Sequence, residues 1–205
     1  MRLIGGTCAG LILKVPKGLG VRPTPDLVRQ AIFNSLGGRV LGARVLELFG
    51  GSGALSLECL SRGAAEATCV ERSSKHARFI EQNFIATGLD RGRFHLRVQD
   101  VFTAIPQLTG EGARFDLILA DPPFGEKNTG RRSESLSQCL LDDPDLPELL
   151  APNGLFVLGH ARRDTLTLTS EWIELKEMKH GDSMMRFLKR GILAPPDGDI
   201  EARSR

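Results

Sequence analysis

From Val45 to Leu55 the chain reads VLELFGGSGAL, an apolar run that ends in glycines and continues into a helical pattern. Glycine lets the backbone turn sharply and approach a ligand closely, and the helix start that follows presents free N–H groups. Nucleotide-binding Rossmann enzymes and methyltransferases both use such a unit. A dinucleotide fingerprint needs a third glycine, and counting from Gly51 that position holds Ser56. The stretch predicts an open α/β fold with a cofactor loop, with a plain tight turn as the alternative.

The alternation of short apolar runs and helical stretches continues on the carboxyl side of this unit. Strands are predicted at Arg44–Phe49, Ala67–Glu71, Arg93–Val98, Phe115–Ala120 and Gly154–Leu158, with helices near 53–62, 73–87, 101–108 and 134–150. Strands this apolar are covered on both faces, which indicates a mostly parallel sheet between layers of helices. The runs Trp172–Lys179 and Ser183–Lys189 flank Gly181-Asp182 and predict a closing antiparallel hairpin.

The amino-terminal part of the chain is locally basic, although the formal net charge of the whole chain is only +2. Residues 1–36 contain one acid, Asp26, and five basic side chains: Arg2, Lys14, Lys17, Arg22 and Arg29. Such an excess suits contact with an anion, and a solvated arm is the alternative. Met1–Ile4 and Gly10–Val15 predict a short β-hairpin. Thr24 is predicted to cap a helix that has Pro25 in its first position and ends at Gly37-Gly38.

Length and composition limit the remaining possibilities. With 205 residues and 41% hydrophobic content, we expect a basic arm over 1–24, one catalytic domain over 25–190 and a flexible tail over 191–205. No window approaches the roughly 18 apolar residues of a transmembrane helix, and the first residues show no signal peptide, so we expect a cytoplasmic protein. The four cysteines and four histidines show no metal-binding spacing, and we expect free thiols and no metal.

Three acidic residues stand in or just after predicted strands. Glu47 precedes the glycines, Glu71 ends the second strand, and Asp100 follows the third. A carboxylate at the end of the second strand accepts hydrogen bonds from the ribose of an adenosine. Glu47 is suited to accept one from an ammonium group, such as that of S-adenosylmethionine (SAM). Asp100 is suited to an adenine amino group, with Val101 packed on the ring.

Asp121-Pro122-Pro123-Phe124 directly follows the fourth strand, at the carboxyl edge where open α/β sheets bind ligands. Consecutive prolines stiffen the backbone and remove N–H donors, which leaves carbonyls and the Asp121 carboxylate as a cluster of acceptors. Such a cluster can hold an exocyclic amino group by both hydrogens, and Phe124 supplies a flat face for a base. The motif predicts chemistry on a planar amine, and a rigid turn with a capping acid is the alternative.

These motifs resemble those of the RsmD family, SAM-dependent class I methyltransferases that modify the N2 amine of one guanine in bacterial 16S ribosomal RNA. The resemblance covers about residues 1–190 and is carried by Met1–Gly6, Val15–Gly18, Val21–Thr24, Val28–Asn34, Leu48–Leu55, Leu60–Ala64 and Asp121–Phe124. It implies a Rossmann-like fold with a central, mostly parallel seven-stranded sheet, helices on both faces, a C-terminal antiparallel hairpin and an N-terminal β-hairpin arm. It also implies SAM as cofactor and S-adenosylhomocysteine as product.

The resemblance, read with the motifs, assigns candidate residues to three roles. The catalytic set is Asp121, Pro122, Pro123 and Phe124. The cofactor set is Glu47, Phe49, Gly50, Gly51, Ser52, Gly53, Ala54, Glu71, Arg72, Asp100, Val101, Arg22, Thr24 and Arg29. The RNA set is Lys14, Lys17, Arg39, Lys127, Arg131 and Arg132. Arg22 and Arg29 fit either the methionyl carboxylate of SAM or RNA phosphates, and the sequence does not separate these roles.

The chain also departs from the family pattern. Gly50 stands where the loop usually has alanine, which should be harmless, and Glu47 stands where aspartate is commoner. Gly159-His160 replaces a common glutamate after the fifth strand, and the stretch 125–147 is long and ends in an acidic run. These departures concern the shape of the substrate side more than the reaction.

We expect 16S ribosomal RNA as partner, either alone or within an assembled 30S subunit, no membrane contact, and a monomer. Alternatives are a related methyltransferase acting on adenine N6 or a protein glutamine amide, a dinucleotide-dependent oxidoreductase, and a non-enzymatic RNA-binding scaffold. The missing third glycine and the Asp-Pro-Pro-Phe motif argue against the oxidoreductase. Intact cofactor and amine motifs argue against the scaffold.

Overall fold

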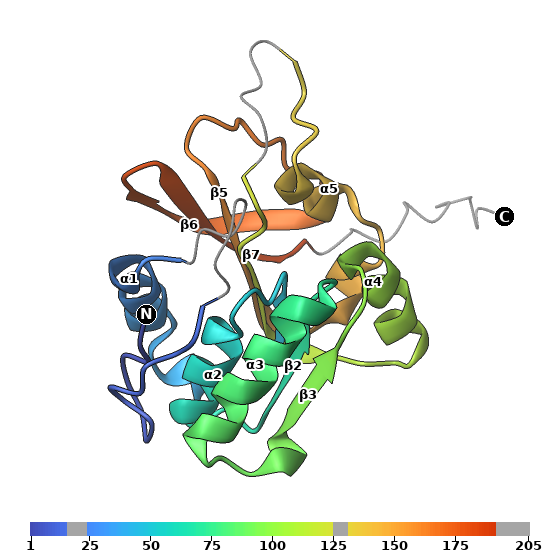
Figure 1. The fold of residues 1–205 in the computed structure, drawn as a ribbon. Coiled ribbons are helices and arrows are strands. Elements are labelled where there is room, and N and C mark those ends of the chain that lie inside the picture. Colours follow the sequence, from blue (N-terminus) through green and yellow to red (C-terminus); the bar gives the residue numbers. More distant parts are fainter. Residues whose placement is uncertain (16–23, 125–130, 192–205) are drawn as a thin grey trace, which may run out of the picture.

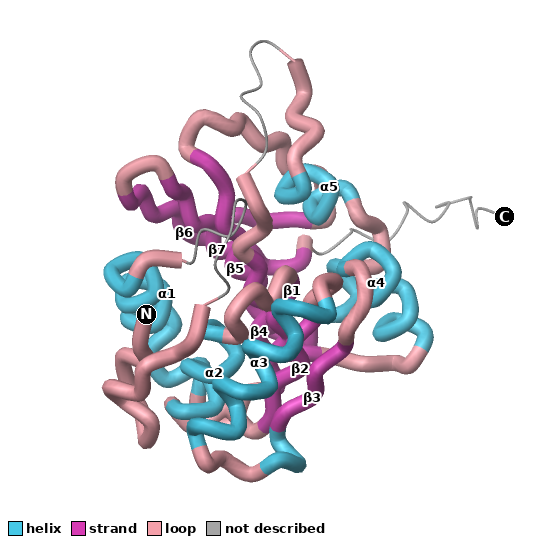
Figure 2. The backbone as a smooth tube through the Cα atoms, viewed as in Figure 1, coloured by secondary structure: helices cyan, strands magenta, loops and turns pink. Residues whose placement is uncertain are grey.

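The structure is a computed structural model that describes residues 1–15, 24–124 and 131–191 (Figure 1). Its centre is a seven-stranded sheet in the order β3-β2-β1-β4-β5-β7-β6 (Figure 2). The strands are β1 (Arg44–Leu48), β2 (Glu66–Val70), β3 (Phe94–Arg97), β4 (Phe115–Ala120), β5 (Leu150–Ala161), β6 (Trp172–His180) and β7 (Ser183–Arg190). The first five strands are parallel, whereas β7 pairs antiparallel with both β5 and β6. The predicted Rossmann-like sheet with a closing hairpin is confirmed.

Helices cover both faces of the sheet because successive strand side chains point to opposite sides. Val45 packs with the helices α1 (Asp26–Leu36), α2 (Ala54–Ser61) and α3 (Ser74–Thr87) on one face. Its neighbour Leu46 packs on the other face with α4 (Val101–Gly110), α5 (Leu136–Asp142) and the 3-10 turn η3 (Leu146–Leu149). Two further 3-10 turns, η1 (Gly37–Val40) and η2 (Arg91–Arg93), lead into β1 and β3. The apolar β1, β2 and β4 are therefore buried between two separate cores.

The strand order places one edge of the sheet in the position to bind a ligand. The chain moves from β1 outward through β2 to β3, and then crosses back to β4 on the other side of β1. The connections that follow β1 and β4 consequently diverge, and such a switch point opens a crevice at the carboxyl ends of the strands. The glycine loop follows β1 and the Asp-Pro-Pro-Phe motif follows β4, so the two motifs meet at this crevice.

Residues 1–15 pack into the domain. Arg2 and Ile12 form an antiparallel bridge, so the predicted hairpin exists as one bridge and a few backbone bonds rather than two regular strands. Leu3 and Leu13 are buried in the α1–α2–α3 core. The buried carboxylate of Glu58 on α2 accepts hydrogen bonds from the backbone N–H groups of Ile4 and Gly5, both at 2.8 Å.

Two predicted boundaries are wrong, each for a local reason. The helix expected near 134–150 is instead the short α5 and the turn η3, because Asp143 accepts the backbone N–H groups of Asp145 and Leu146 at 2.9 and 3.0 Å and closes a turn between them. The fifth strand begins at Leu150 rather than Gly154, since the chain stays paired with β4 through an irregularity in which Asn153 has a φ of 64°.

The predicted cap of the first helix is also wrong. The N-cap residue of α1 is Pro25, no side chain caps this helix, and the Thr24 hydroxyl is bonded elsewhere. None of the helices in the three described segments is long and apolar enough to cross a membrane. Within the same segments, no three His, Cys, Asp or Glu residues are grouped so that they could hold a metal ion.

Candidate active site

A cavity of about 890 Å³ opens at the carboxyl ends of β1, β2, β3 and β4. It is lined by Met1, Val15, Thr24, Pro25, Glu47, Phe49, Gly50, Gly51, Ser52, Ala54, Leu55, Glu71, Arg72, Ser73, Lys75, His76, Asp100, Val101, Phe102, Asp121, Pro122, Pro123, Phe124, Leu136 and Ser183. The glycine loop, the acids that follow the strands and the Asp-Pro-Pro-Phe motif thus share one site.

The glycine loop has a backbone that few residues tolerate. Phe49, the first residue after β1, has a φ of 61°, and Gly51 and Gly53 have φ values of 57° and 74°. A positive φ at a bulky aromatic residue is uncommon and marks a turn that the surrounding structure enforces. A Cβ on Gly53 would also lie 2.9 Å from Ile80 of α3. The loop therefore folds close against α3 and turns its backbone toward the cavity.

Gly50 is matched to a neighbouring cysteine. A Cβ at this position would lie 2.4 Å from the Sγ of Cys69 and 3.1 Å from Ile80. The φ of Gly50 is not in the left-handed region, so space and not backbone conformation favours glycine here. Cys69 is fully buried on β2, and this burial raises the pKa of its thiol well above the usual range. The neutral thiol of Cys69 therefore fills the space that the methyl group of an alanine would need, which explains why this position holds glycine.

Glu47 is a buried residue of β1 whose carboxylate reaches the first turn of α2. Its Oε1 accepts the N–H of Leu55 at 3.3 Å and its Oε2 accepts the N–H of Ser56 at 3.0 Å. Burial raises the pKa of Glu47 to about 6, against the opposing effect of these hydrogen bonds. A cation placed beside the carboxylate would favour its ionised form, so this side chain is suited to meet an ammonium group.

Glu71 ties the end of β2 to the glycine loop. Its two oxygens accept the backbone N–H groups of Gly51 and Ser73, each at 2.8 Å, and the Nδ1 of His76 lies 3.5 Å from the Oε1. Carboxylate oxygens have lone pairs for more than one donor, so these bonds are compatible with an additional contact to a ribose. The carboxylate is thereby held in one orientation at the cavity wall.

An apolar corner of the cavity lies at the start of α4. Asp100 caps this helix by accepting the N–H of Phe102 at 2.9 Å, and Val101 is buried behind it. The ring of Phe102 meets that of Phe49 edge to face, with 6.4 Å between centroids. The corner offers a carboxylate beside apolar surface, which is the chemistry that an adenine ring requires.

Asp121 and the three residues after it line the cavity where β4 ends. Pro122 is buried, Pro123 is exposed, and Phe124 is half-buried. The Asp121 carboxylate accepts a hydrogen bond from the hydroxyl of Thr24. Along the sheet, the order β3-β2-β1-β4 therefore aligns Asp100, Glu71, Glu47 and Asp121 across one edge.

Several predicted residues lie elsewhere. Gly53 is the N-cap residue of α2 and does not line the cavity. Arg29 is fully buried, where it pairs with Asp26 at 2.7 Å and donates to the carbonyl of Arg2 at 2.5 Å. Arg39 is at the opposite edge of the sheet, where its guanidinium donates to the carbonyl of Asn153 at 3.4 Å. The predicted site residues Lys17, Arg22 and Lys127 lie outside the described residues.

The other predicted basic residues differ in their surroundings. Lys14 lies over α3, where its ammonium group donates to Gln82 at 3.1 Å. Arg131 and Arg132 are exposed, and Arg132 pairs with Asp142 at 2.5 Å. Arg72 lines the cavity.

Sequence reasoning missed Asn83, which joins three parts of the site. This buried amide on α3 donates to the carbonyls of Lys14 and Ser52 at 2.8 and 2.9 Å, and accepts the N–H of Lys14 at 2.7 Å. It connects the amino-terminal segment to the glycine loop. A lone asparagine in a helix gives no sequence signal for this role. Sequence reasoning also missed Phe102, which lines the cavity. Its position directly after Asp100 and Val101 in the sequence could have indicated this.

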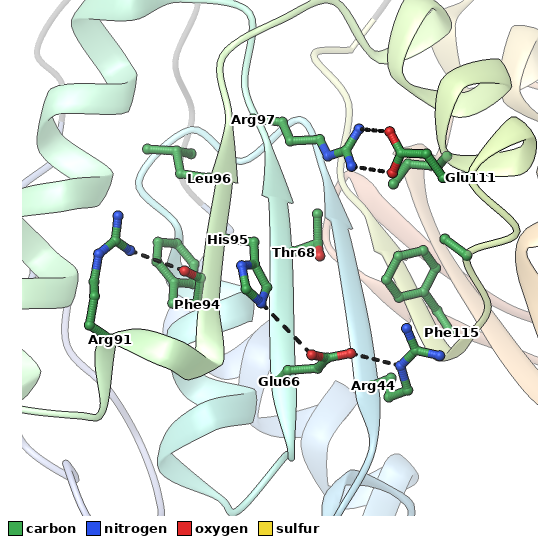
Figure 3. Close-up of a pocket in the computed structure, with 12 residues that line it drawn as sticks. Arg44, Glu66, Thr68, Arg91, Phe94, His95, Leu96, Arg97, Glu111 and Phe115 are labelled. Carbon is green, nitrogen blue, oxygen red and sulfur yellow. Dashed lines mark hydrogen bonds and ion pairs between the residues drawn. The ribbon is translucent and has the colours of Figure 1, made fainter.

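A second hollow extends along the edge strand β3 and reaches the first residues of β1, β2 and β4 (Figure 3). Glu66 sits between Arg44 at 2.7 Å and His95 at 3.8 Å, and Arg97 pairs with both oxygens of Glu111 (Figure 3). These charges neutralise one another in pairs, so this hollow presents less unbalanced charge than the cavity at the carboxyl edge.

Known proteins resemble this chain over almost all of its length. The family model described as conserved hypothetical protein 95 matches residues 1–189. The "Ribosomal RNA small subunit methyltransferase D" of Escherichia coli is 32% identical over 200 residues, covering 97% of this chain and 94% of that protein. The "Putative rRNA methyltransferase YlbH" of Bacillus subtilis is 33% identical over 171 residues, covering 82% and 87%.

A solved structure agrees with these relatives. The structure described as "Putative methyltransferase yhhF from Escherichia coli" superposes with a TM-score of 0.74 at 30% identity, covering 93% of this chain and 98% of that one. The chain that carries the motifs at the cavity therefore matches named methyltransferases both in sequence and in fold. This chain belongs to the family described as conserved hypothetical protein 95, the RsmD-type methyltransferases.

Proposed function

We propose that this protein transfers a methyl group from SAM to the exocyclic N2 amine of a guanine in small-subunit ribosomal RNA. The observation that carries the proposal is that one cavity is lined both by Asp121–Phe124, which can accept an amine, and by the glycine loop and Asp100, Glu71 and Glu47, which suit SAM. The names of the E. coli and B. subtilis relatives support ribosomal RNA as the substrate class.

The cavity fits SAM by the chemistry of its lining. Asp100, Glu71 and Glu47 follow one another along the strand order β3-β2-β1. They suit, in turn, an adenine amino group, two ribose hydroxyls and an ammonium group, which is the order of these groups in SAM. Carboxylates at four adjoining strand ends also favour a cofactor that carries positive charge. When bound, SAM supplies an electrophilic methyl group on a positively charged sulfur. The remainder of SAM leaves as S-adenosylhomocysteine.

The protein's contribution to the reaction is mainly positioning. Asp121 and the carbonyl of Pro122 accept the two hydrogens of the target amine and turn its nitrogen toward the cofactor. Phe124 stacks on the base, which has been extruded from its RNA helix. An N–C bond would form as the S–C bond breaks, and the methylated amine would then pass one proton to water or to the Asp121 carboxylate that holds it. The methylated amine is acidic enough that Asp121 need not be a strong base.

The basic residues outside the cavity would hold the RNA backbone. Lys14 precedes the cavity-lining Val15 in the sequence, Arg131 and Arg132 stand shortly before the cavity-lining Leu136, and Lys17 and Lys127 lie between described segments. Phosphate contacts position an RNA without reading its sequence, so these residues account for affinity and not for the choice of guanine.

Replacing Asp121 by alanine tests the amine-holding role. We expect Asp121→Ala to abolish methyl transfer from labelled SAM to unmodified small subunits, while SAM affinity measured by calorimetry stays within about threefold, since the residue binds the acceptor and not the cofactor. Asp116→Ala is a matched control, because Asp116 lies on the same strand and accepts the N–H of Arg44 at the far edge of the sheet. Near-normal turnover of Asp121→Ala would refute the role.

A further inference from the structure

Thr24 makes an unusual contact for a residue placed just before a helix. Threonine in this position ordinarily caps its own helix, yet α1 begins after Pro25 without any side-chain cap. The Thr24 hydroxyl instead donates to the Oδ2 of Asp121, 97 residues away in the sequence. A segment that leads out of the basic arm is thus bonded directly to the carboxylate of the amine-binding motif.

The Oδ1 of Asp121 occupies the space that a side chain at position 159 would otherwise fill, and residue 159 is glycine. A Cβ on Gly159 would lie 2.4 Å from the Oδ1 of Asp121 and 3.3 Å from the Sδ of Met185. The φ of Gly159 is not positive, so the glycine is required here for space and not for backbone conformation. The buried hydroxyl of Ser137 donates to the Gly159 carbonyl at 3.1 Å and holds this part of β5 in place.

Together these contacts fix the carboxylate on two sides. Oδ2 is held by a hydroxyl from the segment before α1, and Oδ1 rests against the bare backbone of β5. A carboxylate oxygen accepts more than one hydrogen bond, so the Thr24 bond is compatible with a second bond to an amine. Methyl transfer depends on a narrow range of nitrogen positions, and a carboxylate that rotated freely would hold the amine less well.

We propose that Thr24 is a positioning residue that orients Asp121 for the target amine, and that Gly159 provides the slot that makes this orientation possible. The inference rests on the proposed function, because it gives Asp121 the task of holding the acceptor. It reassigns Thr24 from the cofactor set to the acceptor side of the cavity.

The test uses the protein of 205 residues, labelled SAM and unmodified small subunits. Thr24→Val keeps the shape of the side chain and removes the donor, and we expect kcat to fall about tenfold to a hundredfold, the cost of a lost hydrogen bond to a charged group. The KM and the calorimetric Kd for SAM should remain within about twofold. Thr24→Ser restores the hydroxyl and should recover most of the lost kcat.

Gly159→Ala approaches the same carboxylate from the other side. Its methyl group should displace Asp121 and lower kcat about tenfold or more, again without weakening SAM binding. Thr109→Val and Gly110→Ala are matched controls, because Thr109 donates weakly to a carbonyl far from the cavity and a Cβ on Gly110 would meet nothing within 4 Å. Both controls should keep the kcat of the unmodified protein.

The outcomes separate this inference from the proposed function. If the unmodified protein methylates no RNA, the proposed function itself is wrong. If it is active and Thr24→Val has the same kcat, the positioning role alone is wrong. If Thr24→Val instead weakens SAM binding and keeps its kcat, Thr24 contacts the cofactor. A loss of kcat that Thr24→Ser does not rescue would show that the hydroxyl is not responsible.

Discussion

Replacing Gly50 by alanine tests how tightly the glycine loop is built against β2. The added methyl group would lie 2.4 Å from the Cys69 Sγ and 3.1 Å from Ile80, where ordinary contacts begin near 3.4 Å. Cys69 and Ile80 are both fully buried and cannot move toward solvent. Overpacking of this kind costs about 1–3 kcal/mol. We therefore expect Gly50→Ala to lower the free energy of unfolding by that amount.

A double-mutant cycle identifies Cys69 as the cause. Cys69→Ala alone removes one buried heavy atom and should cost about 1 kcal/mol. In the double variant the new methyl group occupies the space left by the thiol, so the two losses should not add, and the coupling should exceed about 1 kcal/mol. Urea unfolding is readily followed by the fluorescence of Trp172, the single and buried tryptophan. Strict additivity, or a Gly50→Ala variant as stable as the unmodified protein, would refute this reasoning.

Two further predictions concern the cofactor and the RNA. Because the pKa of Glu47 is raised to about 6 and a cationic ligand favours the ionised carboxylate, SAM affinity should fall as the pH decreases from 7 through 6. Calorimetry should show this fall flattened in Glu47→Gln, and an unchanged pH dependence in that variant would exclude Glu47 as its source. Charge reversal of Lys14 and Lys17 should weaken RNA binding and reduce its dependence on salt by about one unit of log–log slope for each phosphate that is no longer neutralised. Arg91→Glu, at the amino edge of the sheet, is the control, and equal effects in both variants would contradict a phosphate-binding role for the arm.

The sheet and the place of the Asp-Pro-Pro-Phe motif at its carboxyl edge could be predicted from the sequence because both depend on local patterns. Short, nearly continuous apolar runs define β1 and β4 within a few residues, and glycines and prolines mark the turns that follow them. The carboxyl ends of parallel strands meet at one edge, so the acids at Glu47, Glu71 and Asp121 could be placed together from the strand pattern alone.

The remaining features depend on contacts between distant parts of the chain. Thr24 lies beside a helix start, and its local signal for capping is overridden by Asp121, which comes close only after β4 has entered the sheet. Arg29 carries a charge typical of the surface, yet it is fully buried, and its Nη2 donates to the Asp26 carboxylate and to the Arg2 carbonyl. Asn83 joins Lys14 to Ser52 through hydrogen bonds that no spacing in the sequence reveals.

The most direct test of the proposed activity is to identify the nucleoside that this protein methylates. Unmodified 30S subunits, 16S ribosomal RNA and DNA are each incubated with labelled SAM, and the products are digested and separated by mass spectrometry. We predict N2-methylguanosine at a single position in the small-subunit RNA, from the subunit or the free RNA, and none in DNA. N6-methyladenosine, or label found only in protein, would contradict the assignment of the cavity to a guanine amine.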